Sequence, residues 1–313
     1  MPLTPATANG SAATPTLSAS RPISALRGTA WRHTRRDLLQ GNDAGSCTLE
    51  MLPEGTLRYL KQLPRESVLC ILNAAANGLQ LTTLKDDHKR TIYRVWLDGQ
   101  SFILKTYRNL HRWLAVSPDT KGWLCSHRLQ NDVPCYAWYR RHDLSSATII
   151  YADAGNRDLY MPECLQESQA ICSNRFAQAG AIIAALHRQN IFHADTKPSN
   201  FVFQDGTQQP STVQLIDTDD VRAYWHLSRK RRAKNLAQFL GCTRRDILPT
   251  IYDNAHMAFL HAYMNQLPAQ PMDILALIPE IRRAMAILYP DRIERQQQLC
   301  TQLLARLQQR TEA

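Results

Sequence analysis

Hydrophobic and polar residues alternate from about residue 80 to residue 107, as they do in strands that bury one face. The dipeptide Asp98-Gly99 interrupts this alternation and is typical of a two-residue hairpin turn. Short apolar stretches further along the chain have the same strand-like character. Strands are therefore predicted at residues 91–97, 101–107, 147–151 and 158–161.

Later in the chain the apolar residues recur every three or four positions, which indicates helices. One helix is predicted over 168–189 and a shorter one over 120–131. After residue 220 the pattern is helical almost throughout, with apolar stripes over 247–263 and 293–307. A strand-rich first part thus precedes a helix-rich second part, and this order predicts an α+β fold with two lobes.

The composition is that of an ordinary globular protein. The chain has 313 residues, of which 44% are hydrophobic and 20% charged, and this excludes a disordered chain, a collagen or a coiled-coil rod. No uncharged apolar run reaches the ~20 residues of a membrane-spanning helix, and the opening residues lack the apolar core of a secretory signal. The eight cysteines form no C-x-x-C pair and have no zinc-ligand spacing, so we expect reduced thiols.

The net charge of +10 is unevenly distributed along the chain. Residues 1–36 contain five Arg and no acid, and we expect this Ser-, Thr-, Ala- and Pro-containing segment to be a disordered basic tail. Its composition is also that of an organelle transit peptide. Residues 221–245 contain eight Lys or Arg and no acid, which leaves a net charge of −3 on the rest of the chain. The positive charge is therefore local.

The most informative segment runs from Ile191 to Phe203, and a later apolar strand ends at Asp217. The segment contains His193-x-Asp195, with Asn200 five residues after the aspartate. This pattern resembles the catalytic and metal-binding loops of the protein-kinase-like phosphotransferases, H-R-D-x-x-x-x-N followed by D-F-G. Their chemistry requires one carboxylate that accepts the proton of the attacking hydroxyl, and an amide oxygen and a second carboxylate that hold Mg²⁺.

Carried over residue by residue, the resemblance implies that Asp195 is the catalytic base and that Asn200 and Asp217 bind Mg²⁺. Lys197 would stabilise charge on the transferred phosphoryl group, and His193 would have a structural role in the loop. The alternative is a surface loop with chance polar residues. The combined H-x-D-x-K-P-x-N motif, with a strand-ending aspartate after it, disfavours that alternative.

Two further segments match the same superfamily. Lys105, on the second strand of the predicted hairpin, matches the lysine that contacts the α- and β-phosphates of ATP. A lone lysine on a strand is otherwise a solvated edge charge. The segment 160–165 resembles the hinge between the lobes, which implies nucleotide contacts from Glu163 and Cys164.

Two features depart from the protein-kinase pattern. No G-x-G-x-x-G loop precedes the strand lysine, so the cover over the nucleotide would rely on Lys85, Lys89 or Arg90, or on other backbone amides. The helix that should present a glutamate to the same lysine offers none between residues 106 and 162, and Asp119 is a shorter substitute.

Other features resemble the bacterial lipopolysaccharide core kinases, which include the heptose and 3-deoxy-D-manno-octulosonic acid kinases. These features are the absence of an A-P-E segment, the loop Leu-Ile-Asp217-Thr-Asp219, Val133-Pro134, and the segments 235–240 and 259–263. The resemblance covers about residues 80–265. It divides the chain into a tail (1–36), an N-terminal extension (37–79), a sheet lobe with hinge (80–163) and a helical lobe (164–313).

The resemblance implies a cytoplasmic enzyme that transfers the γ-phosphoryl group of ATP, with Mg²⁺, to a hydroxyl of a lipopolysaccharide core sugar. The basic stretch 221–245 would attract an anionic glycolipid or the surface of the inner membrane. A solvated helix face is the plain alternative, and nucleic acid is disfavoured because no binding motif accompanies the charge. Two other functions stay open: a kinase of a protein or soluble small molecule, and an inactive pseudokinase scaffold.

Overall fold

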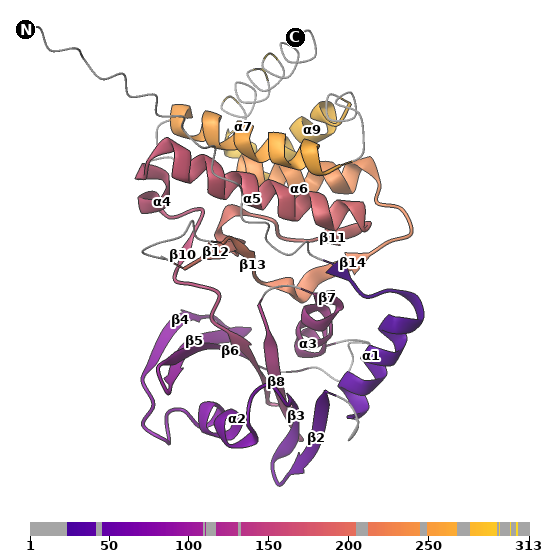
Figure 1. Ribbon diagram of the computed structural model, residues 1–313, viewed down its shortest axis with the longest axis vertical. Helices are drawn as coiled ribbons and strands as arrows, with labels where there is room; N and C mark the ends of the chain where they lie inside the picture. The colour runs from indigo at the N-terminus through magenta and orange to yellow at the C-terminus, as the bar shows by residue number, and fades with distance from the viewer. Residues whose placement is uncertain are drawn as a thin grey trace, which may run out of the picture.

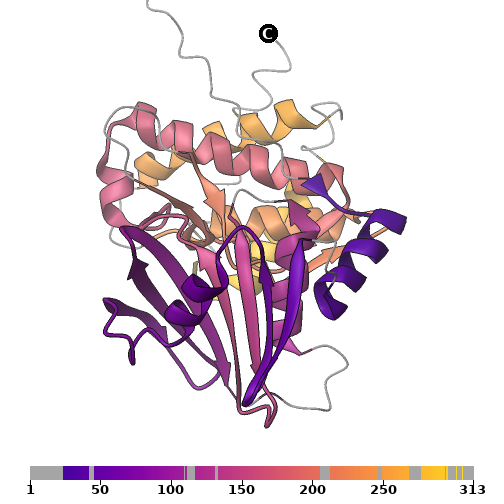
Figure 2. The same ribbon diagram turned by 60° about the horizontal axis from the view of Figure 1, so that its bottom comes forward.

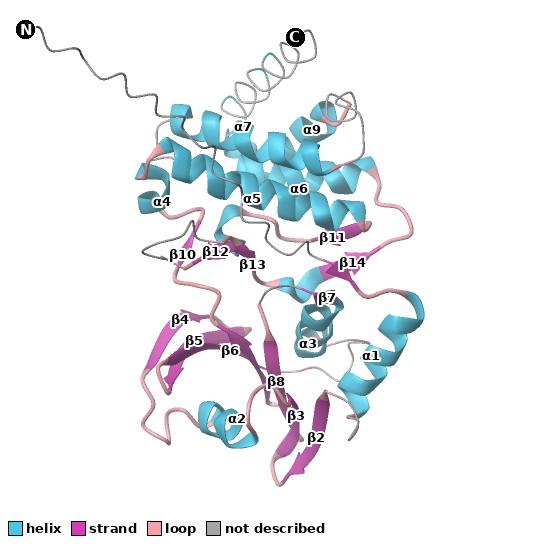
Figure 3. Cartoon of the chain, in the orientation of Figure 1, coloured by secondary structure: helices cyan, strands magenta, loops and turns pink. Residues whose placement is uncertain are grey.

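The computed structural model describes residues 24–41, 46–108, 110, 117–130, 133–204, 212–244, 249–267, 276–292, 294, 301 and 305. They form two lobes, a strand-rich lobe at the bottom of Figure 1 and a helix-rich lobe at the top. Figure 3 shows the same division by secondary structure. The expected α+β fold, with an antiparallel sheet lobe followed by a mainly helical lobe, is confirmed.

The first lobe is built on a seven-stranded sheet in which neighbouring strands are antiparallel. In their order across the sheet, the strands are β2 (Cys47–Leu52), β3 (Gly55–Leu60), β8 (Cys135–Arg141), β9 (Ser146–Ala152), β6 (Gln100–Arg108), β5 (Arg90–Leu97) and β4 (Leu81–Asp86). The predicted hairpin is β5 and β6. Its turn residues have φ of 50° at Asp98 and 75° at Gly99, the left-handed conformations that favour Asp-Gly in tight hairpins.

Helices cover both faces of this sheet. α1 (Gly28–Gln40) and α3 (Pro118–Arg128) belong to the apolar cluster on one face, together with Ile149 of β9. α2 (Arg65–Leu72) belongs to the cluster on the other face, together with Ile150, and lies in front of the strands in Figure 2. Ile149 and Ile150 are neighbours on β9 but belong to different clusters, because successive side chains of a strand point to opposite faces of the sheet.

The expected disordered tail is wrong for residues 24–36. β1 (Ser24–Ala25) pairs with β7 (Leu129–Gln130), and α1 begins three residues later. Leu38 on α1 is 3% exposed, and its carbonyl accepts a hydrogen bond from the Trp123 indole of α3 at 3.2 Å. The many Arg residues give this segment the composition of a tail, but the few apolar side chains of α1 are enough to pack the helix against α3. The first 23 residues lie outside the described part of the chain.

The boundaries of the lobes differ from those expected. β2 and β3 precede residue 80 and belong to the same sheet as the later strands, so no N-terminal extension separates from the lobe there. The chain crosses to the second lobe between Ala152, at the end of β9, and β10 (Arg157–Asp158), which is earlier than the expected boundary at residue 163.

The second lobe is dominated by long helices. They are α5 (Gln169–Arg188), α6 (Arg229–Gly241), α7 (Pro249–Gln266) and α9 (Ile278–Leu288), with the short α4 (Pro162–Gln166) before them. A Cβ at Gly180 of α5 would lie 2.1 Å from the carbonyl oxygen of Phe259, so glycine permits the close approach of α7. Phe259 in turn stacks on Phe239 of α6 with a centroid distance of 4.1 Å. The core of this lobe is therefore shared by α5, α6 and α7.

The predicted helices are largely confirmed. The helix expected over 168–189 is α5, that expected over 120–131 is α3, and much of the stripe over 247–263 falls on α7. The stripe over 293–307 lies almost entirely outside the described residues. The strand expected over 158–161 begins in β10 but ends at Asp158.

Short antiparallel sheets lie between the large sheet and the long helices (Figure 1). One contains β10, β12 (Phe201–Phe203) and β13 (Gln214–Leu215), and the other contains β11 (Ile191–His193) and β14 (Val221–Ala223). The 3₁₀ turns η1 (Pro198–Asn200) and η2 (Thr218–Asp220) connect them, and a third, η3 (Pro290–Arg292), follows α9.

Two whole-chain expectations can be checked on the described residues. Their seven cysteines are all free thiols, as expected. None of the helices described is both long and apolar enough to cross a membrane.

Candidate active site

The catalytic-loop motif lies on the turn between β11 and β12. His193 ends β11, and its Nδ1 accepts a hydrogen bond from the backbone amide of Asp195 at 3.1 Å. The side-chain amide of Asn200 donates to the backbone carbonyl of Asp195 at 2.8 Å. Burial lowers the pKa of His193, which favours the neutral ring that this acceptor role requires. The turn is thus closed on itself by two polar side chains, and His193 is structural.

The side chains of Asp195 and Lys197 form an ion pair that is open to solvent. Lys197 Nζ lies 2.8 Å from Asp195 Oδ2, and the two side chains are 42% and 41% exposed. A carboxylate that water can reach can also be reached by the hydroxyl group of a substrate. The pair therefore offers a base and a cation side by side at the edge of the helical lobe.

Two polar residues of α6 hold the backbone of this loop. The side-chain amides of Asn235 and Gln238 donate to the carbonyls of His193 and Ala194. The hydroxyl of Thr196 donates to the backbone carbonyl of Asn235 at 2.8 Å. All of these polar side chains are buried, and a buried carbonyl left without a donor costs about 1–3 kcal/mol. These contacts keep the loop in one conformation.

The chain of hydrogen bonds continues from α6 into α5 and α7. Because the amide nitrogen of Asn235 donates to the loop, its Oδ1 accepts from His187 Nε2, at 3.1 Å. The hydroxyl of Tyr263 then donates to His187 Nδ1 at 2.7 Å. Burial lowers the pKa of His187 to about 4, so the ring is neutral at pH 7, as both bonds require.

Opposite this loop, β6 presents a buried cation to the acids that follow β13. Side chains two residues apart share one face of a strand, so Lys105 and Tyr107 both lie on the side of α3. Lys105 Nζ lies 2.6 Å from Asp217 Oδ1 and also contacts Asp219 Oδ2. The hydroxyl of Tyr107 donates to Asp219 Oδ2 at 2.6 Å. The structure thus brings Lys105 to Asp217, as expected, and leaves the lysine only 5% exposed.

Asp217 has a backbone and an ionisation state suited to binding cations. Its φ of 59° and ψ of 50° are left-handed, a conformation that costs a non-glycine residue about 1 kcal/mol or more. Burial opposes the charged form of its carboxyl. Lys105 and Arg90 outweigh this effect and lower the pKa of Asp217 below its usual range. The carboxylate is therefore ionised at pH 7, as a metal ligand must be.

Arg90 is the second cation beside the two acids. It lies opposite Tyr107 in the β5–β6 pairing and so projects from the same face of the sheet. Its guanidinium lies 3.4 Å from each carboxylate oxygen of Asp217 and 3.6 Å from Asp219 Oδ2. These contacts are longer than those of Lys105, so Arg90 is the cation more readily exchanged for another partner.

The segment in place of a glycine loop is held by an aspartate. The backbone amides of Lys89 and Arg90 each donate to Asp87 Oδ1 at 2.8 Å, and these bonds lower the pKa of Asp87. Lys85 lies 3.1 Å from the same side chain. Of the three residues expected to cover a nucleotide, Arg90 alone contacts Asp217 and Asp219 in the described structure. The backbone amides of Lys89 and Arg90 already donate to Asp87.

Comparisons with known proteins bear on this arrangement. The model of the lipopolysaccharide kinase (Kdo/WaaP) family matches residues 139–263, a range that contains the catalytic-loop motif and Asp217. This confirms the resemblance to the lipopolysaccharide core kinases. No curated protein matches the chain. A solved structure described as WaaP in complex with acyl carrier protein is 17% identical, with a TM-score of 0.48, and the match covers 69% of this chain and 92% of that chain.

One part of the kinase resemblance is corrected by the structure. Glu163 and Cys164 belong to α4 of the helical lobe, beyond the crossing between the lobes, and do not form a hinge. Cys164 is 2% exposed in the core of that lobe, and burial raises the pKa of its thiol to about 11. The error has a simple cause, since over the six residues 160–165 a buried helix and a buried strand have the same apolar content.

The crossing itself runs through residues 153–156. Arg94 of β5 bonds the carboxylate of Asp153 at 2.6 Å and the carbonyl of Gly155 at 2.9 Å. Gly155 has a φ of 138°, and a Cβ there would lie 2.1 Å from the carbonyl oxygen of Phe203. Glycine is therefore required where the crossing passes close to β12.

Several residues of the site had no role assigned from the sequence. Tyr107 and Asp219 join the buried ion pair, and Asn235 and Gln238 hold the catalytic loop. A signal for the α6 pair is present in the sequence, because two amides stand among the apolar residues of Asn-Leu-Ala-Gln-Phe-Leu. Polar residues on the buried face of a helix require partners, and here the partners are the backbone of the active-site loop.

Proposed function

We propose that this protein transfers the γ-phosphoryl group of ATP to a hydroxyl group on a sugar of the lipopolysaccharide core. The observation that carries the proposal is the meeting of Lys105 of the sheet lobe with Asp217 of the helical lobe, together with the exposed carboxylate of Asp195. The family model, which describes lipopolysaccharide kinases, supports the acceptor class. The chemistry of phosphoryl transfer asks mainly for position and charge, and these residues supply both.

On the nucleotide side, Lys105 and Arg90 bind the phosphates. Asp217 and Asn200 fit a Mg²⁺ ion, because carboxylate and amide oxygens are suitable ligands and the two segments are joined by the hydrogen bond from Ile216 N to Asn200 O at 2.9 Å. In the described residues no group of three or more His, Cys, Asp or Glu could hold a metal, but Mg²⁺ on a nucleotide takes its remaining ligands from phosphate and water. When bound, the ion neutralises charge on the β- and γ-phosphates.

On the acceptor side, Asp195 accepts the proton of the attacking hydroxyl through its exposed carboxylate. Lys197 is 2.8 Å away and leaves this carboxylate to contact the transferred group. The backbone of the loop does not need to rearrange, because α6 already holds it at His193 and Ala194. The loop is therefore organised before the substrate arrives.

The decisive experiment is transfer of phosphate from γ-labelled ATP to purified lipopolysaccharide acceptors. We expect Asp195→Asn to lower the turnover by about 10²–10⁴-fold, the usual contribution of a general base, with an unchanged melting temperature. Asp143→Asn is the matched control, because this exposed aspartate bonds only within its own turn.

The outcomes of this assay separate the alternatives. Turnover of Asp195→Asn near that of the wild type would remove the residue from the mechanism. Label in an added protein or a soluble sugar, and none in the glycolipid, would replace the acceptor class. Absence of Mg-ATP binding by the wild type would favour a pseudokinase scaffold.

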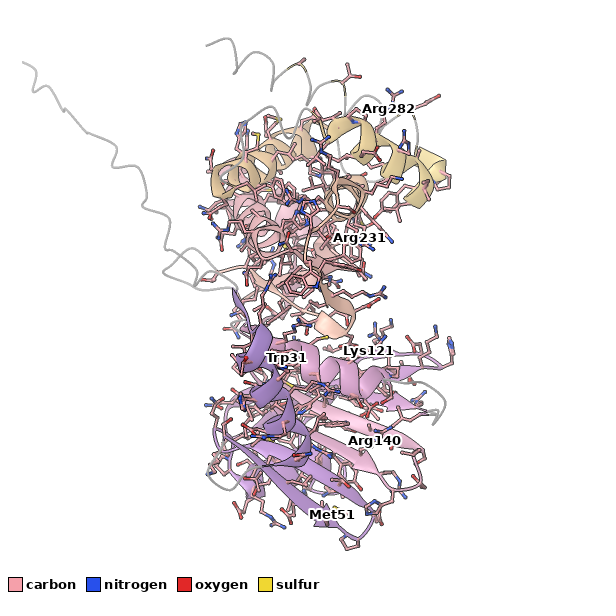
Figure 4. The ribbon with its side chains drawn as sticks, turned by 90° about the vertical axis from the view of Figure 1, so that its right-hand side faces the viewer. Trp31, Met51, Lys121, Arg140, Arg231 and Arg282 are labelled. Carbon is pink, nitrogen blue, oxygen red and sulfur yellow. The ribbon has the colours of Figure 1, made fainter. Side chains whose placement is uncertain are left out.

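The acceptor side also has a basic surface beside an exposed tryptophan. α6 begins with Arg229, Lys230 and Arg231, all exposed, and Trp225 in the preceding loop is fully exposed. Arg231 lies four residues before Asn235, which is about 6 Å along the helix axis from the residue that holds the catalytic loop. Figure 4 shows Arg231 on the face of the molecule that also carries Lys121. We infer that this surface rests on an anionic bilayer that presents the glycolipid.

Co-sedimentation with vesicles tests this contact. Binding is expected to phosphatidylcholine vesicles only when they contain phosphatidylglycerol, because each basic residue contributes about 1 kcal/mol near an anionic surface. Trp225→Ser should weaken binding, since an indole favours the membrane interface. Ile287→Ser, at an exposed apolar residue of α9, should not. Equal binding of wild type and Trp225→Ser would contradict the contact.

A further inference from the structure

Asp219, the second acid of the Asp-x-Asp loop, makes contacts that differ from those of a solvent-facing carboxylate. Its Oδ2 receives Lys105 Nζ and the hydroxyl of Tyr107, the latter at 2.6 Å. Its Oδ1 is buried and has no hydrogen-bond partner in the described structure. The side chain is 18% exposed. The carboxylate thus faces the ammonium group of Lys105.

α3 packs against this carboxylate, and the residue of α3 at the contact is a glycine, Gly122. A Cβ on Gly122 would lie 2.8 Å from the hydroxyl of Tyr107 and 3.1 Å from Asp219 Oδ1. The acid of the same helix, Asp119, is fully buried elsewhere, where it accepts a hydrogen bond from Trp138 Nε1 at 3.0 Å and lies 3.6 Å from Arg140 Nε. α3 therefore packs a glycine against Asp219 and directs its one acidic side chain elsewhere.

We propose that Asp219 is the residue that positions Lys105 for the phosphates, in the role that a helix glutamate has in protein kinases. This assignment rests on the proposed function. The two acids of the loop then have separate tasks. Asp219 holds the lysine from the side of Tyr107 and α3, and Asp217, which has no contact with Tyr107 among the described hydrogen bonds, is left for the metal.

The arrangement links the lysine and the metal ligand through one short segment. Because Asp217 and Asp219 are two residues apart, η2 places both at once. α3 supports η2 by a hydrogen bond between the hydroxyls of Ser126 and Thr218 at 3.0 Å. The lysine is consequently in place whenever η2 is packed under α3, and no swing of a glutamate into the site is needed.

The kinetic test compares Asp219→Asn with Asp217→Asn. We expect Asp219→Asn to raise the KM for ATP by about tenfold, as for the loss of one charge-assisted contact, with no change in the Mg²⁺ concentration that gives half-maximal rate. Asp217→Asn should raise that Mg²⁺ concentration. An equal shift in the Mg²⁺ requirement in both variants would overturn the proposal, because Asp219 would then be a metal ligand.

A second pair of variants tests the role of the glycine. Gly122→Ala would push a methyl group against Tyr107 and Asp219, and we expect it to raise the KM for ATP in the same direction as Asp219→Asn. Lys121→Ala is the matched control on the same helix, because its exposed side chain faces solvent (Figure 4). If both alanine variants bind ATP as the wild type does, the close packing of α3 on Asp219 has no part in placing the lysine.

A readout without ATP keeps this inference separate from the proposed function. Acetylation of lysines by acetic anhydride, which releases acetate as the amide forms, is followed by peptide mass spectrometry and reports how firmly Lys105 is held, with exposed Lys197 as the internal reference. We expect the ratio of Lys105 to Lys197 labelling to rise in Asp219→Asn relative to the wild type. An unchanged ratio would refute the positioning role, even if phosphate transfer to lipopolysaccharide is observed. A raised ratio without any transfer would leave that role intact and remove the proposed function.

Discussion

Two lysine–aspartate pairs lie in the same site in opposite environments. Lys105 is held between Asp217 and Asp219 with 7% of its side chain exposed, and Tyr107 completes the group. Lys197 pairs with Asp195 where about two fifths of each side chain is exposed. The first pair is fixed by several partners from both lobes, and the second consists of two side chains on one loop.

Under the proposed function, the difference corresponds to two kinds of chemical task. Phosphate groups have a constant shape, so a cation that is already fixed in position can bind them. Such preorganised charge needs no rearrangement during the reaction. A general base has to exchange its ion-pair partner for a substrate hydroxyl, and breaking an exposed ion pair costs little free energy. What is rigid around Asp195 is the backbone beneath it, which Asn235 and Gln238 hold.

The largest expected effect comes from deleting each lysine in turn. Lys105→Met leaves two acids in a mostly buried site with the hydroxyl of Tyr107 and the longer contacts of Arg90 as their remaining partners, and we expect it to lower the free energy of unfolding by about 3–5 kcal/mol. Lys197→Met, the matched variant, removes an exposed pair and should cost at most about 1 kcal/mol. Urea unfolding of the ligand-free proteins measures both. Equal losses would show that burial does not distinguish the pairs.

A smaller effect should appear in the pH dependence of stability, through the support of the catalytic loop. The pKa of His187 is about 4 in the folded protein and 6.5 in its ordinary state, so the unfolded chain takes up the proton first as the pH falls. The stability contributed by the neutral ring is complete above pH 6.5. It is lost progressively down to pH 4, by about 3 kcal/mol in all.

Unfolding measured across this interval tests the contribution. His187→Gln should reduce the slope between pH 6.5 and 4 without abolishing it, because burial also lowers the pKa of His127 to about 4. His33→Gln, at an exposed position of α1, is the control and should keep the slope of the wild type. A slope in His187→Gln as steep as that of the wild type would show that His187 does not contribute to it.

The fold followed from the sequence where patterns were long and local. The Asp98-Gly99 turn needs positive φ at both residues, and because Asp-Gly favours this conformation the dipeptide predicts the hairpin. α5 has twenty residues of helical period, and α3 was recognised from one shorter stretch. By contrast, α1 carries so many arginines that its composition indicates a tail, although Leu38 is buried against α3.

The site could be predicted only where residues are close in sequence. The motif from His193 to Asn200 is one loop, so its spacing reveals it. The partners of Lys105 come from more than a hundred residues away, and neither the use of Asp219 nor the close packing of Gly122 on it follows from any local pattern. The hinge was misplaced for a related reason, because the apolar residues of the short segment 160–165 do not show which lobe will bury them.

The short strand β1 bears on how far the lobes can rotate as rigid bodies. Its backbone pairs with Leu129 and Gln130 just after α3, and the amide of Ala25 donates to the side chain of Gln189 in the helical lobe at 2.5 Å. Together with the crossing at residues 153–156, it ties the two lobes at separate edges. A shortened form of the chain that starts after α1 would keep every residue of the catalytic apparatus and still lose one of the ties that limit hinge bending.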